Sequence, residues 1–485
     1  MSILGAMNTA VSGLAAQAAA FSNISDNIAN SQTVGYKGVD TSFSDYLTSS
    51  SPTENDPHTV VAAPEYQNTV QGTITTSTNS LALAISGQGF FDVSQPTGTS
   101  STGQTTFASQ QYFSRNGNFQ VNSSGYLAND AGQYLNGYIT NASGVLDKSK
   151  VVPIQVAQTV YQPVATEKMN MTANLPAGLV STVTEDANGN VTAMYDSSGN
   201  QVPAIQPETQ IYDAQGTSHT IQYTWTPVPA TPPTAGATAT SSATTANEWV
   251  LSASMGGADL GEVQVNFSAD GTLLGISPVG STTITPTGSG TATPGATTIA
   301  GAVPTYGNAN NGNSGTITFD TGLGTATAGT TQKITLNLGD IGKTNGVTQF
   351  SSSSFTLRGL SQDGVPPGSF TGISTQASGN IYANYDNGQT RLIAQVPIAT
   401  FANADALQSK NGSSYTVTLQ SGNPSLQDAG TNGAGSLVTS SVESSNVDLA
   451  AQLSKLIVAQ QAYSANAKVV TTSDTLLQAT LDMKR

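Results

Sequence analysis

The 485-residue chain has no cysteine, which excludes disulfide bonds, thiol catalysis and cysteine-ligated zinc. Charged residues are only 9% of the chain, and acidic residues outnumber basic ones to give a net charge of −15. A chain this acidic repels phosphate backbones and anionic lipids, so we expect no nucleic-acid binding. The lack of cysteine is also compatible with export as an unfolded chain, although it fixes no compartment.

Long apolar runs are missing too. No stretch approaches the roughly 20 apolar residues that a membrane-spanning helix needs, so we expect no membrane insertion. The first 36 residues carry one charge, Asp26, and lack the basic start of a cleaved secretory signal. Residues 11–21, VSGLAAQAAAF, imitate the apolar core of such a signal, but Ser12, Gly13 and Gln17 interrupt it. If the protein is exported, we expect no cleaved signal peptide.

Patterns of catalysis and ligand binding are scarce. His58 and His219 belong to no triad and no H-E-x-x-H motif, and the carboxylates are scattered through turns, where Asp is favoured. SGQGFF at 86–91 lacks the G-x-G-x-x-G spacing, and DANGN at 186–190 lacks the closing Glu of an EF-hand. We expect no enzyme, cofactor or metal. An unrecognised pair of carboxylates, as in a glycosidase, stays open as an alternative.

Both ends of the chain have the period of a coiled-coil helix. Seam residues recur at alternating spacings of three and four, with one polar break at Ser25. In the second helix we expect Asn446 as N-cap and Asp448 in the first turn. The predicted helix-packing and polymerisation interface comprises Leu4, Met7, Val11, Leu14, Phe21 and Ile28 with Leu449, Leu453, Leu456, Tyr463, Val470, Leu477 and Leu481.

The simpler alternative is an antiparallel helix pair within one chain, packed on a globular body. Against it, the face opposite the N-terminal seam is small and uncharged, which suits close packing against further copies. This face carries Ala6, Ala10, Ala15, Ala16 and Ala20. Short uncharged helices at chain ends fray unless they dock, so we predict that both ends are largely disordered in the monomer and order on assembly.

Between the two ends, short strands and turns replace the helical period. Asn116-Gly117, Ser124-Gly125, Asp363-Gly364 and Asn387-Gly388 mark predicted hairpins. Two tracts rich in Thr, Ala, Gly and Pro, 227–247 and 280–305, are predicted to be exposed loops or mobile insertions. The predicted fold class is therefore mainly β with terminal α-helices, in a nested order of helix, β, a more variable β block, β and helix.

Four stretches resemble the bacterial flagellar rod and hook proteins. SDNIANSQTVGYKGVDTSF at 25–43 resembles the N-terminal signature, ISGQGFFDV at 85–93 the glycine-aromatic motif, 112–138 the hairpin after it, and 443–485 the C-terminal helix. The motif residues are Asn27, Asn30, Thr33, Gly35, Tyr36, Gly87, Gly89, Phe90, Phe91, Asn446, Val447 and Asp448. The resemblance covers roughly 1–145 and 360–485.

Within this family the length favours a hook subunit, since rod subunits are shorter, and so do QDGVPPGSFTGIS and GQTRLIAQVPIATFAN. The resemblance implies coaxial nested domains, with the two end helices forming a coiled-coil inner domain. The expected parts are an inner domain of 1–30 and 441–485, an extended connecting segment of 31–70, a β-rich middle domain of 71–150 and 358–440, and a β-rich outer domain of 151–357 with a subdomain or insertions near 227–247 and 280–305.

The resemblance implies a structural protein that polymerises with itself into a curved, bendable tube. Such a tube acts as a universal joint that carries torque from the rod to the filament. Further implied partners are the rod, hook-cap and hook-filament junction proteins and the export apparatus, and the implied location is the extracellular hook. A distal rod protein and a secreted β-rich adhesin or carbohydrate-binding protein stay as alternatives, although an adhesin leaves the helices at both ends unexplained.

Overall fold

The computed structural model describes residues 3–51, 54–100, 105–141, 143–185, 191–229, 242–277, 279, 288–291, 305–308, 314–324 and 331–483. Within these ranges the side chains of 3–4, 46–51, 54–58, 242–243, 288–291, 305–308 and 481 are not described. The DANGN turn, most of the two low-complexity tracts and the side chains of Leu4, His58 and Leu481 therefore lie outside the description. The chain forms two compact units, unit 1 from 1–159 with 370–485 and unit 2 from 160–369.

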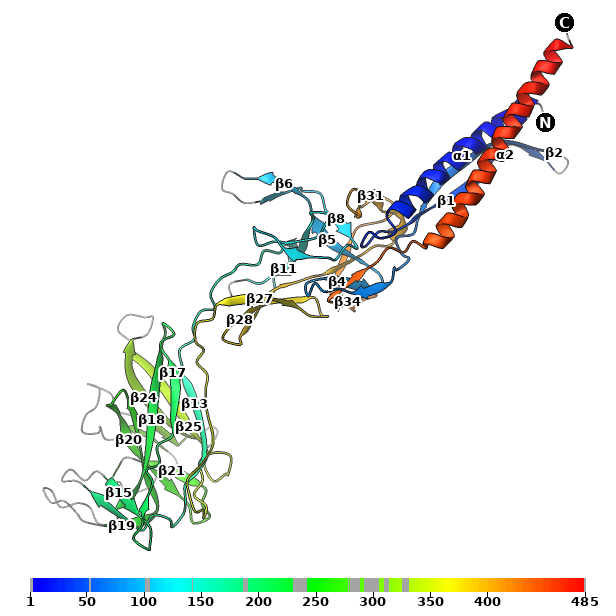
Figure 1. Ribbon diagram of the computed structural model, residues 1–485. Helices are drawn as coiled ribbons and strands as arrows, with labels where there is room; N and C mark the ends of the chain where they lie inside the picture. Colours follow the sequence, from blue (N-terminus) through cyan, green and yellow to red (C-terminus); the bar gives the residue numbers. More distant parts are fainter. Residues whose placement is uncertain are drawn as a thin grey trace. The chain divides into compact units, whose positions relative to one another are not determined.

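Unit 1 contains both helices, α1 (Ile3–Ala29) and α2 (Leu449–Asp482), which lie along each other with their outer ends at the two chain termini (Figure 1). Neither helix, over its described residues, has an apolar stretch long enough to cross a bilayer. Strands β1 (Val39–Ser51) and β2 (Glu54–Tyr66) form an antiparallel hairpin that packs on α1. The sequence predicts only an extended connection over 31–70, whereas the structure folds most of it back on itself.

The rest of unit 1 is β. Its further elements are β3 (Ile74–Thr76), β4 (Leu83–Ser86), β5 (Phe90–Ser94), β6 (Pro96–Thr99), β7 (Thr105–Phe107), β8 (Tyr112–Ser114), β9 (Gln120–Val121), β10 (Leu127–Ala128), β11 (Tyr134–Ile139), β12 (Val152–Pro153), β27 (Phe370–Thr375), β28 (Asn380–Tyr385), β29 (Thr390–Gln395), β30 (Ile398–Thr400), the short helix η1 (Ala404–Ala406), β31 (Gln408–Lys410), β32 (Ser414–Thr416), β33 (Ser425–Gln427), β34 (Ser436–Thr439) and β35 (Ser441–Glu443).

In this sheet three strands from the N-terminal half lie between strands from the C-terminal half. The main path runs β27-β28-β29-β11-β5-β8-β32-β31, and β30 also pairs with β5. Two small ladders join the halves again, β4 with β34 and β3 with β35. Buried apolar side chains fill the interior, and Phe91 meets Phe119 edge to face at 5.4 Å between ring centroids. Unit 1 therefore needs residues from both ends of the sequence to form its core.

Unit 2 consists of β13 (Lys168–Asn174), β14 (Thr182–Glu185), β15 (Val191–Tyr195), β16 (Gln201–Val202), β17 (Glu208–Tyr212), β18 (Ser218–Pro229), β19 (Ser242–Met255), β20 (Ala258–Phe267), β21 (Leu273–Ser277), β22 (Gly288–Thr291), β23 (Thr305–Asn308), β24 (Ser314–Gly324), β25 (Thr331–Asp340) and β26 (Thr356–Gln362). One sheet runs β22-β23-β24-β25-β13-β26, and the other runs β16-β15-β14-β19-β18-β17, with β20 paired to β19 and β21 paired to β20. The described ends of the 227–247 tract are strand residues of β18 and β19, not loop.

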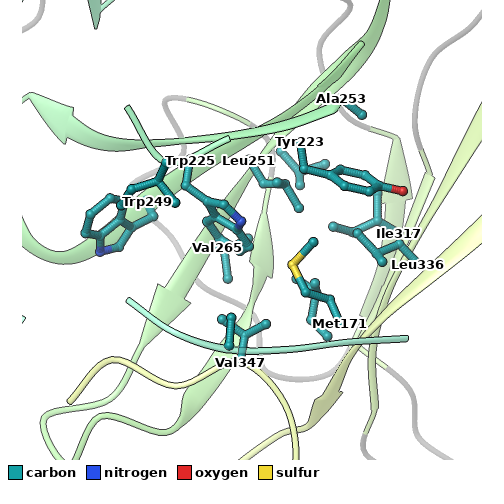
Figure 2. Packing of buried hydrophobic residues seen from close by; sticks show 14 of the residues in the cluster. Met171, Tyr223, Trp225, Trp249, Leu251, Ala253, Val265, Ile317, Leu336 and Val347 are labelled. Carbon is teal, nitrogen blue, oxygen red and sulfur yellow. The ribbon is translucent and has the colours of Figure 1, made fainter. Parts of the chain in front are cut away.

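One large apolar cluster holds unit 2 together (Figure 2). It includes Trp225 and Trp249, the two tryptophans of the chain, with Met171 and Leu336 close by. Burial alternates residue by residue along β24 and β25, as it does when one face of a strand covers a core. Tyr223 lies in the cluster, where its hydroxyl donates a 3.3 Å hydrogen bond to the sulfur of Met169.

Several hairpins share one turn chemistry. In the turns that begin at Asn122, Asp196 and Asp213, the side-chain oxygen accepts the backbone N–H groups two and four residues later. The glycine in each turn has φ of +81°, which only glycine adopts without strain. Two of the predicted hairpins have glycines of positive φ, at Gly125 and Gly388.

The other two predicted hairpins are wrong. Gly117 lies where the chain crosses β4, and a Cβ atom there would stand 1.7 Å from the carbonyl oxygen of Leu83. Gly364 follows β26, where the hydroxyl of Thr166 leaves no room for a Cβ atom either. Asp363 beside it accepts the backbone N–H groups of Glu167 and Lys168 at 2.9 Å. In both places glycine permits a close approach of two segments rather than a turn.

Candidate functional site: the paired terminal segments

Helix α1 is buried on its small-residue side. Ala10, Ala16, Ala20 and Ile24 are buried, and they line hollows shared with α2 and with the β1–β2 hairpin. The expectation that the small-residue face meets further copies is therefore wrong for Ala10, Ala16 and Ala20, which the chain covers itself, whereas Ala15 is exposed and Ala6 is half-buried. Small side chains let the helices approach closely, and at Gly13 a Cβ atom would stand 2.9 Å from Nδ2 of Asn466 on α2.

Polar contacts tie the helices to the hairpin. Ser12 Oγ accepts the backbone N–H of Val60 at 3.1 Å, and Asn23 Nδ2 donates to Thr41 Oγ1 at 2.9 Å. On the other helix, Lys455 Nζ lies 2.5 Å from Asp40 Oδ1. These contacts fix which side of each helix faces the hairpin, and hence which side faces out.

Five of the eleven predicted seam residues whose side chains are described are exposed. The exposed fraction is 51% for Val11 and 49% for Tyr463, and Phe21 is exposed as well. Phe21 and Tyr463 line one hollow of about 520 Å³ between the helices. Leu449 and Leu453 are also exposed, whereas these predicted seam residues are half-buried: Met7, Leu14, Ile28, Leu456, Val470 and Leu477.

Sequence reasoning missed part of this surface. Ile457, Val458, Val469 and Leu476 on α2 are exposed apolar residues outside the predicted seam, with Val458 exposed by 64%. The sequence does hold a signal for two of them: three consecutive apolar residues, LIV at 456–458, place apolar side chains outside the seam as well as in it. Val458 and Val469 line the hollows that α2 shares with α1 and the hairpin, so the exposed apolar residues of α2 lie on more than one side of the helix rather than along a single coiled-coil stripe.

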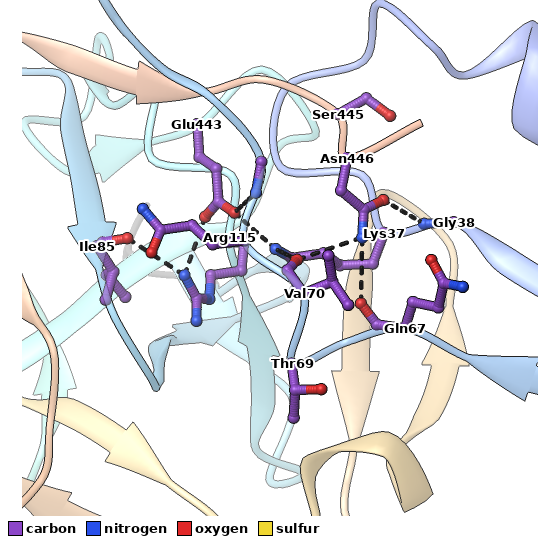
Figure 3. Close-up of polar contacts among 12 residues, drawn as sticks. Lys37, Gly38, Gln67, Thr69, Val70, Ile85, Arg115, Glu443, Ser445 and Asn446 are labelled. Atoms are coloured by element: carbon purple, nitrogen blue, oxygen red, sulfur yellow. Dashed lines mark hydrogen bonds and ion pairs between the residues drawn. The ribbon is translucent and has the colours of Figure 1, made fainter. Parts of the chain in front are cut away.

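A buried carboxylate joins the two chain ends where the helices meet the sheet (Figure 3). Glu443 accepts from Lys37 Nζ at 2.6 Å, from Arg115 Nη1 at 3.0 Å and from the backbone N–H of Gly72 at 2.8 Å. Glu443, Lys37 and Arg115 are each almost fully buried. One residue near the C-terminus therefore holds three segments from the first quarter of the chain.

Backbone carbonyls complete this junction. Lys37 Nζ also donates to the carbonyl of Val70 at 2.6 Å, while Arg115 donates to those of Ile85 at 3.2 Å and Gly87 at 2.8 Å. Burial lowers the pKa of Lys37 and that of Arg115, because water no longer solvates the charged form, and the nearby carboxylate opposes this effect. The carboxylate of Glu443 therefore offsets part of the cost of burying these two cations.

Two asparagines of the family motifs bridge backbone segments. Asn446 accepts the N–H of Gly38 at 2.7 Å and donates to the carbonyls of Gln67 and Val70 at 3.2 Å. Asn27 on α1 donates to the carbonyl of Val39 at 2.8 Å and accepts its N–H at 3.0 Å. At the point where a helix joins the hairpin, each amide side chain therefore makes hydrogen bonds to both N–H and C=O groups of the backbone.

The predicted N-cap of α2 is wrong by two residues. The carboxylate of Asp448 accepts the backbone N–H groups of Ala450 at 2.9 Å and Ala451 at 3.2 Å, which is the geometry of an N-cap. Asn446 is occupied by its contacts to the hairpin instead. An acidic cap also suits the positive end of the helix dipole.

The remaining motif residues serve close packing. Gly35 has φ of +70°, donates to the carbonyl of Glu443 at 2.8 Å, and a Cβ atom on it would stand 2.4 Å from the backbone nitrogen of Asn116. Gly89 has φ of +123° and lies against Ile398. The hydroxyl of Tyr36 donates a hydrogen bond to Asn27, and that of Thr33 donates one to Asn30. Val447 packs against Gly38, and Gly87 has φ of +105°. Phe90 and Phe91 belong to two separate core clusters.

Side chains suited to metal binding do not gather in the part of the chain that the structure describes. No described group of three or more His, Asp or Glu residues could hold a metal ion. His219 lies in unit 2, with Nε2 at 3.1 Å from Asp213 Oδ2, in a hairpin whose turn Asp213 stabilises. Unit 1 instead brings the two terminal segments together as a pair of helices that carry exposed apolar side chains.

Comparison with known proteins gives four family matches along the chain. They are "Flagella basal body rod protein" at 7–37, "Flagellar hook protein FlgE/F/G D1 domain" at 84–193, "Flagellar basal body protein FlaE D2 domain" at 169–365 and "Flagellar basal body rod FlgEFG protein C-terminal" at 438–483. The flagellar hook protein FlgE of Caulobacter vibrioides is 30% identical over 606 aligned positions, which cover 100% of both chains. The chain belongs to the flagellar hook protein family.

Other hook proteins are similar over the same extent. The FlgE protein of Salmonella typhimurium is 26% identical over 98% of this chain and 99% of its own. The crystal structure of Helicobacter pylori flagellar hook protein FlgE2 has a TM-score of 0.42 and 15% identity, covering 75% of this chain and 98% of that one. The protein is thus a structural subunit of the bacterial flagellar hook, and the comparisons favour neither a distal rod protein nor an adhesin.

Proposed function

We propose that the outward apolar surface of α1 and α2 is where one hook subunit packs against the next copies in the tube. The observation that carries this proposal is the exposure of Val11, Phe21 and Tyr463 on helices whose small-residue sides are already covered. Large apolar patches that stay exposed in a single chain usually mark a surface for a partner. The interface comprises the predicted seam residues together with Ile457.

The assembly is head to tail. An interface that joins two different patches and does not close into a ring generates an open helical tube. In this proposal the inner domain of 1–30 and 441–485 supplies torsional stiffness. The middle domain of 71–150 and 358–440 and the outer domain of 151–357 meet their neighbours through more polar, hydrated contacts that slide when the tube bends.

The proposed partners follow from membership of the hook family. They are copies of the chain itself, the rod, hook-cap and hook-filament junction proteins, and the export apparatus. The subunit reaches the extracellular hook without a cleaved signal peptide, and it has a structural role with no catalytic activity. The short ordered charge network around Glu443 supports such a mechanical role, because it connects the helices to the sheet.

The test compares two seam variants with a matched control. Phe21→Ser and Tyr463→Ser each remove apolar surface that the single chain leaves exposed, so folding should persist while tube formation fails. Val145→Ser removes an exposed apolar side chain from a loop of unit 1 away from the helices, and tubes should still form. Electron microscopy and sedimentation measure assembly. Seam variants that assemble at the wild-type critical concentration would overturn the proposal.

A further inference from the structure

One loop of unit 1 presents an unusually exposed leucine. Leu419 lies between β32 and β33, and 98% of its surface is exposed. Among the large hydrophobic residues that the structure describes, the next most exposed is Met483, at 81%, near the end of α2. Val417, two residues before Leu419, is exposed as well. The loop therefore carries an apolar tip that belongs neither to the helices nor to a core.

Hydrogen bonds hold this loop in one shape. The backbone N–H of Thr418 donates to Ser421 Oγ at 2.9 Å, and the N–H of Ser421 donates to Thr418 Oγ1 at 3.1 Å. Ser421 is fully buried, and Thr418 Oγ1 also donates to the carbonyl of Ala406 at 2.7 Å. Such reciprocal Ser/Thr contacts fix a turn, so Leu419 is not free to fold back onto its own unit.

This rigidity separates Leu419 from ordinary surface hydrophobics. Single exposed apolar residues are common on protein surfaces and need no explanation by themselves. Here the turn is fixed in advance, so a partner that buries the side chain gains its apolar area while little backbone freedom is lost. The chemistry of Leu419 and Val417 requires an apolar hollow on that partner.

We propose that Leu419 is a knob that inserts into an apolar hollow on a neighbouring copy of this chain. The inference rests on the proposed polymerisation and adds to it a contact outside the helices. A second copy is the fitting occupant because the chain belongs to a family of self-polymerising flagellar components. In a head-to-tail tube each subunit offers a projecting patch to one neighbour and a receiving patch to another.

Because the chain has no cysteine, a single introduced thiol can report on this contact. Leu419→Cys is labelled with benzophenone maleimide and irradiated both in assembled tubes and in dilute monomer. We expect cross-linked dimers in tubes alone, with the modified peptide coming from a second copy. Val145→Cys, which replaces another exposed apolar residue of unit 1, is the matched control and should give no such product. A label at 419 that blocks assembly, while the same label at 145 does not, supports the proposal as well.

The second readout is assembly itself. Leu419→Ser should raise the critical concentration at least about tenfold, since burial of a leucine side chain is lost, while Leu419→Met should assemble as the wild type does. Thermal unfolding should be unchanged in both variants, because the side chain is almost fully exposed in the single chain. Tubes of normal critical concentration from Leu419→Ser, or cross-links confined to the same chain, overturn the knob. Wild-type protein that forms no tubes would instead contradict the proposed function.

Discussion

Asp92 provides a sharp test of the energetics of unit 1. It lies on β5, almost fully buried, where Oδ1 accepts a 2.7 Å hydrogen bond from Asn136 Nδ2. Within the described residues Oδ2 has no hydrogen-bond partner. Burial raises the pKa of Asp92 from 3.8 to about 6, and the hydrogen bond from Asn136 opposes this rise. At neutral pH the fold therefore holds a carboxylate with only one partner.

The sign of the pH dependence follows from this raised pKa. The folded state binds the proton of Asp92 more tightly than the unfolded state does, so protonation stabilises the fold. That stabilisation is complete below about pH 4, is lost as the pH rises to about 6, and is absent at pH 7. A shift of roughly two units corresponds to about 3 kcal/mol, since each unit is worth about 1.36 kcal/mol.

Asp92→Asn should therefore stabilise unit 1 at pH 7. The amide oxygen still accepts from Asn136, and the buried charge is gone. The new NH₂ group has no evident acceptor, which offsets part of the gain, so we expect about 2 kcal/mol. The variant should also lack the stability change between pH 4 and pH 6 that the wild type shows.

Hydrogen exchange read by mass spectrometry measures this effect on peptides of β5 and β11. Both tryptophans lie in unit 2, so tryptophan fluorescence serves as an internal control and should not change with the substitution. The difference between variant and wild type isolates Asp92 from other titrating groups. An Asp92→Asn protein that is less stable at pH 7, or that keeps the full pH dependence of the wild type, would refute the reasoning.

Two further substitutions probe the junction and the glycine-aromatic motif. Glu443→Gln leaves Lys37 and Arg115 as buried cations without a carboxylate, so unit 1 should lose about 3 kcal/mol in denaturant unfolding, and proteases should cut near β35. Glu65→Gln, which changes an exposed carboxylate, is the control. If Glu443→Gln destabilises unit 1 by no more than this control does, the junction contributes little to stability. Gly89→Ala places a Cβ atom 2.1 Å from Ile398 Cγ2 at φ of +123°, and should cost about 3 kcal/mol by the same assay. Unchanged stability of that variant would contradict the close approach.

Periodicity predicted the helices but not their orientation. Both the seam that contains Val11 and Phe21 and the face that contains Ala10 and Ala20 repeat at spacings of three and four. Either face satisfies the heptad pattern, so the sequence alone did not decide which one the chain covers. The hairpin contacts decide it, and they depend on polar side chains such as Asn23 whose partners are not visible as a pattern.

Contacts between distant segments were beyond sequence reasoning altogether. Glu443 binds Lys37 and Arg115, which lie hundreds of positions earlier, and no local signal marks a carboxylate as buried. The motifs were recognised by resemblance, while the reason for each residue emerged only from the fold. Gly117 is an example: it reads as part of a turn, yet it is needed where the chain crosses Leu83.

In the proposed tube, one side of the helix pair meets the other subunits. A cryo-electron microscopy reconstruction of tubes assembled from the purified chain, at a resolution that shows side chains, tests it most directly. We expect Phe21 and Tyr463 to be buried between copies, while Ala10 and Ala20 stay against the subunit's own α2 and hairpin. Tubes in which Phe21 and Tyr463 remain exposed to solvent, with the subunits joined by other surfaces, would contradict it.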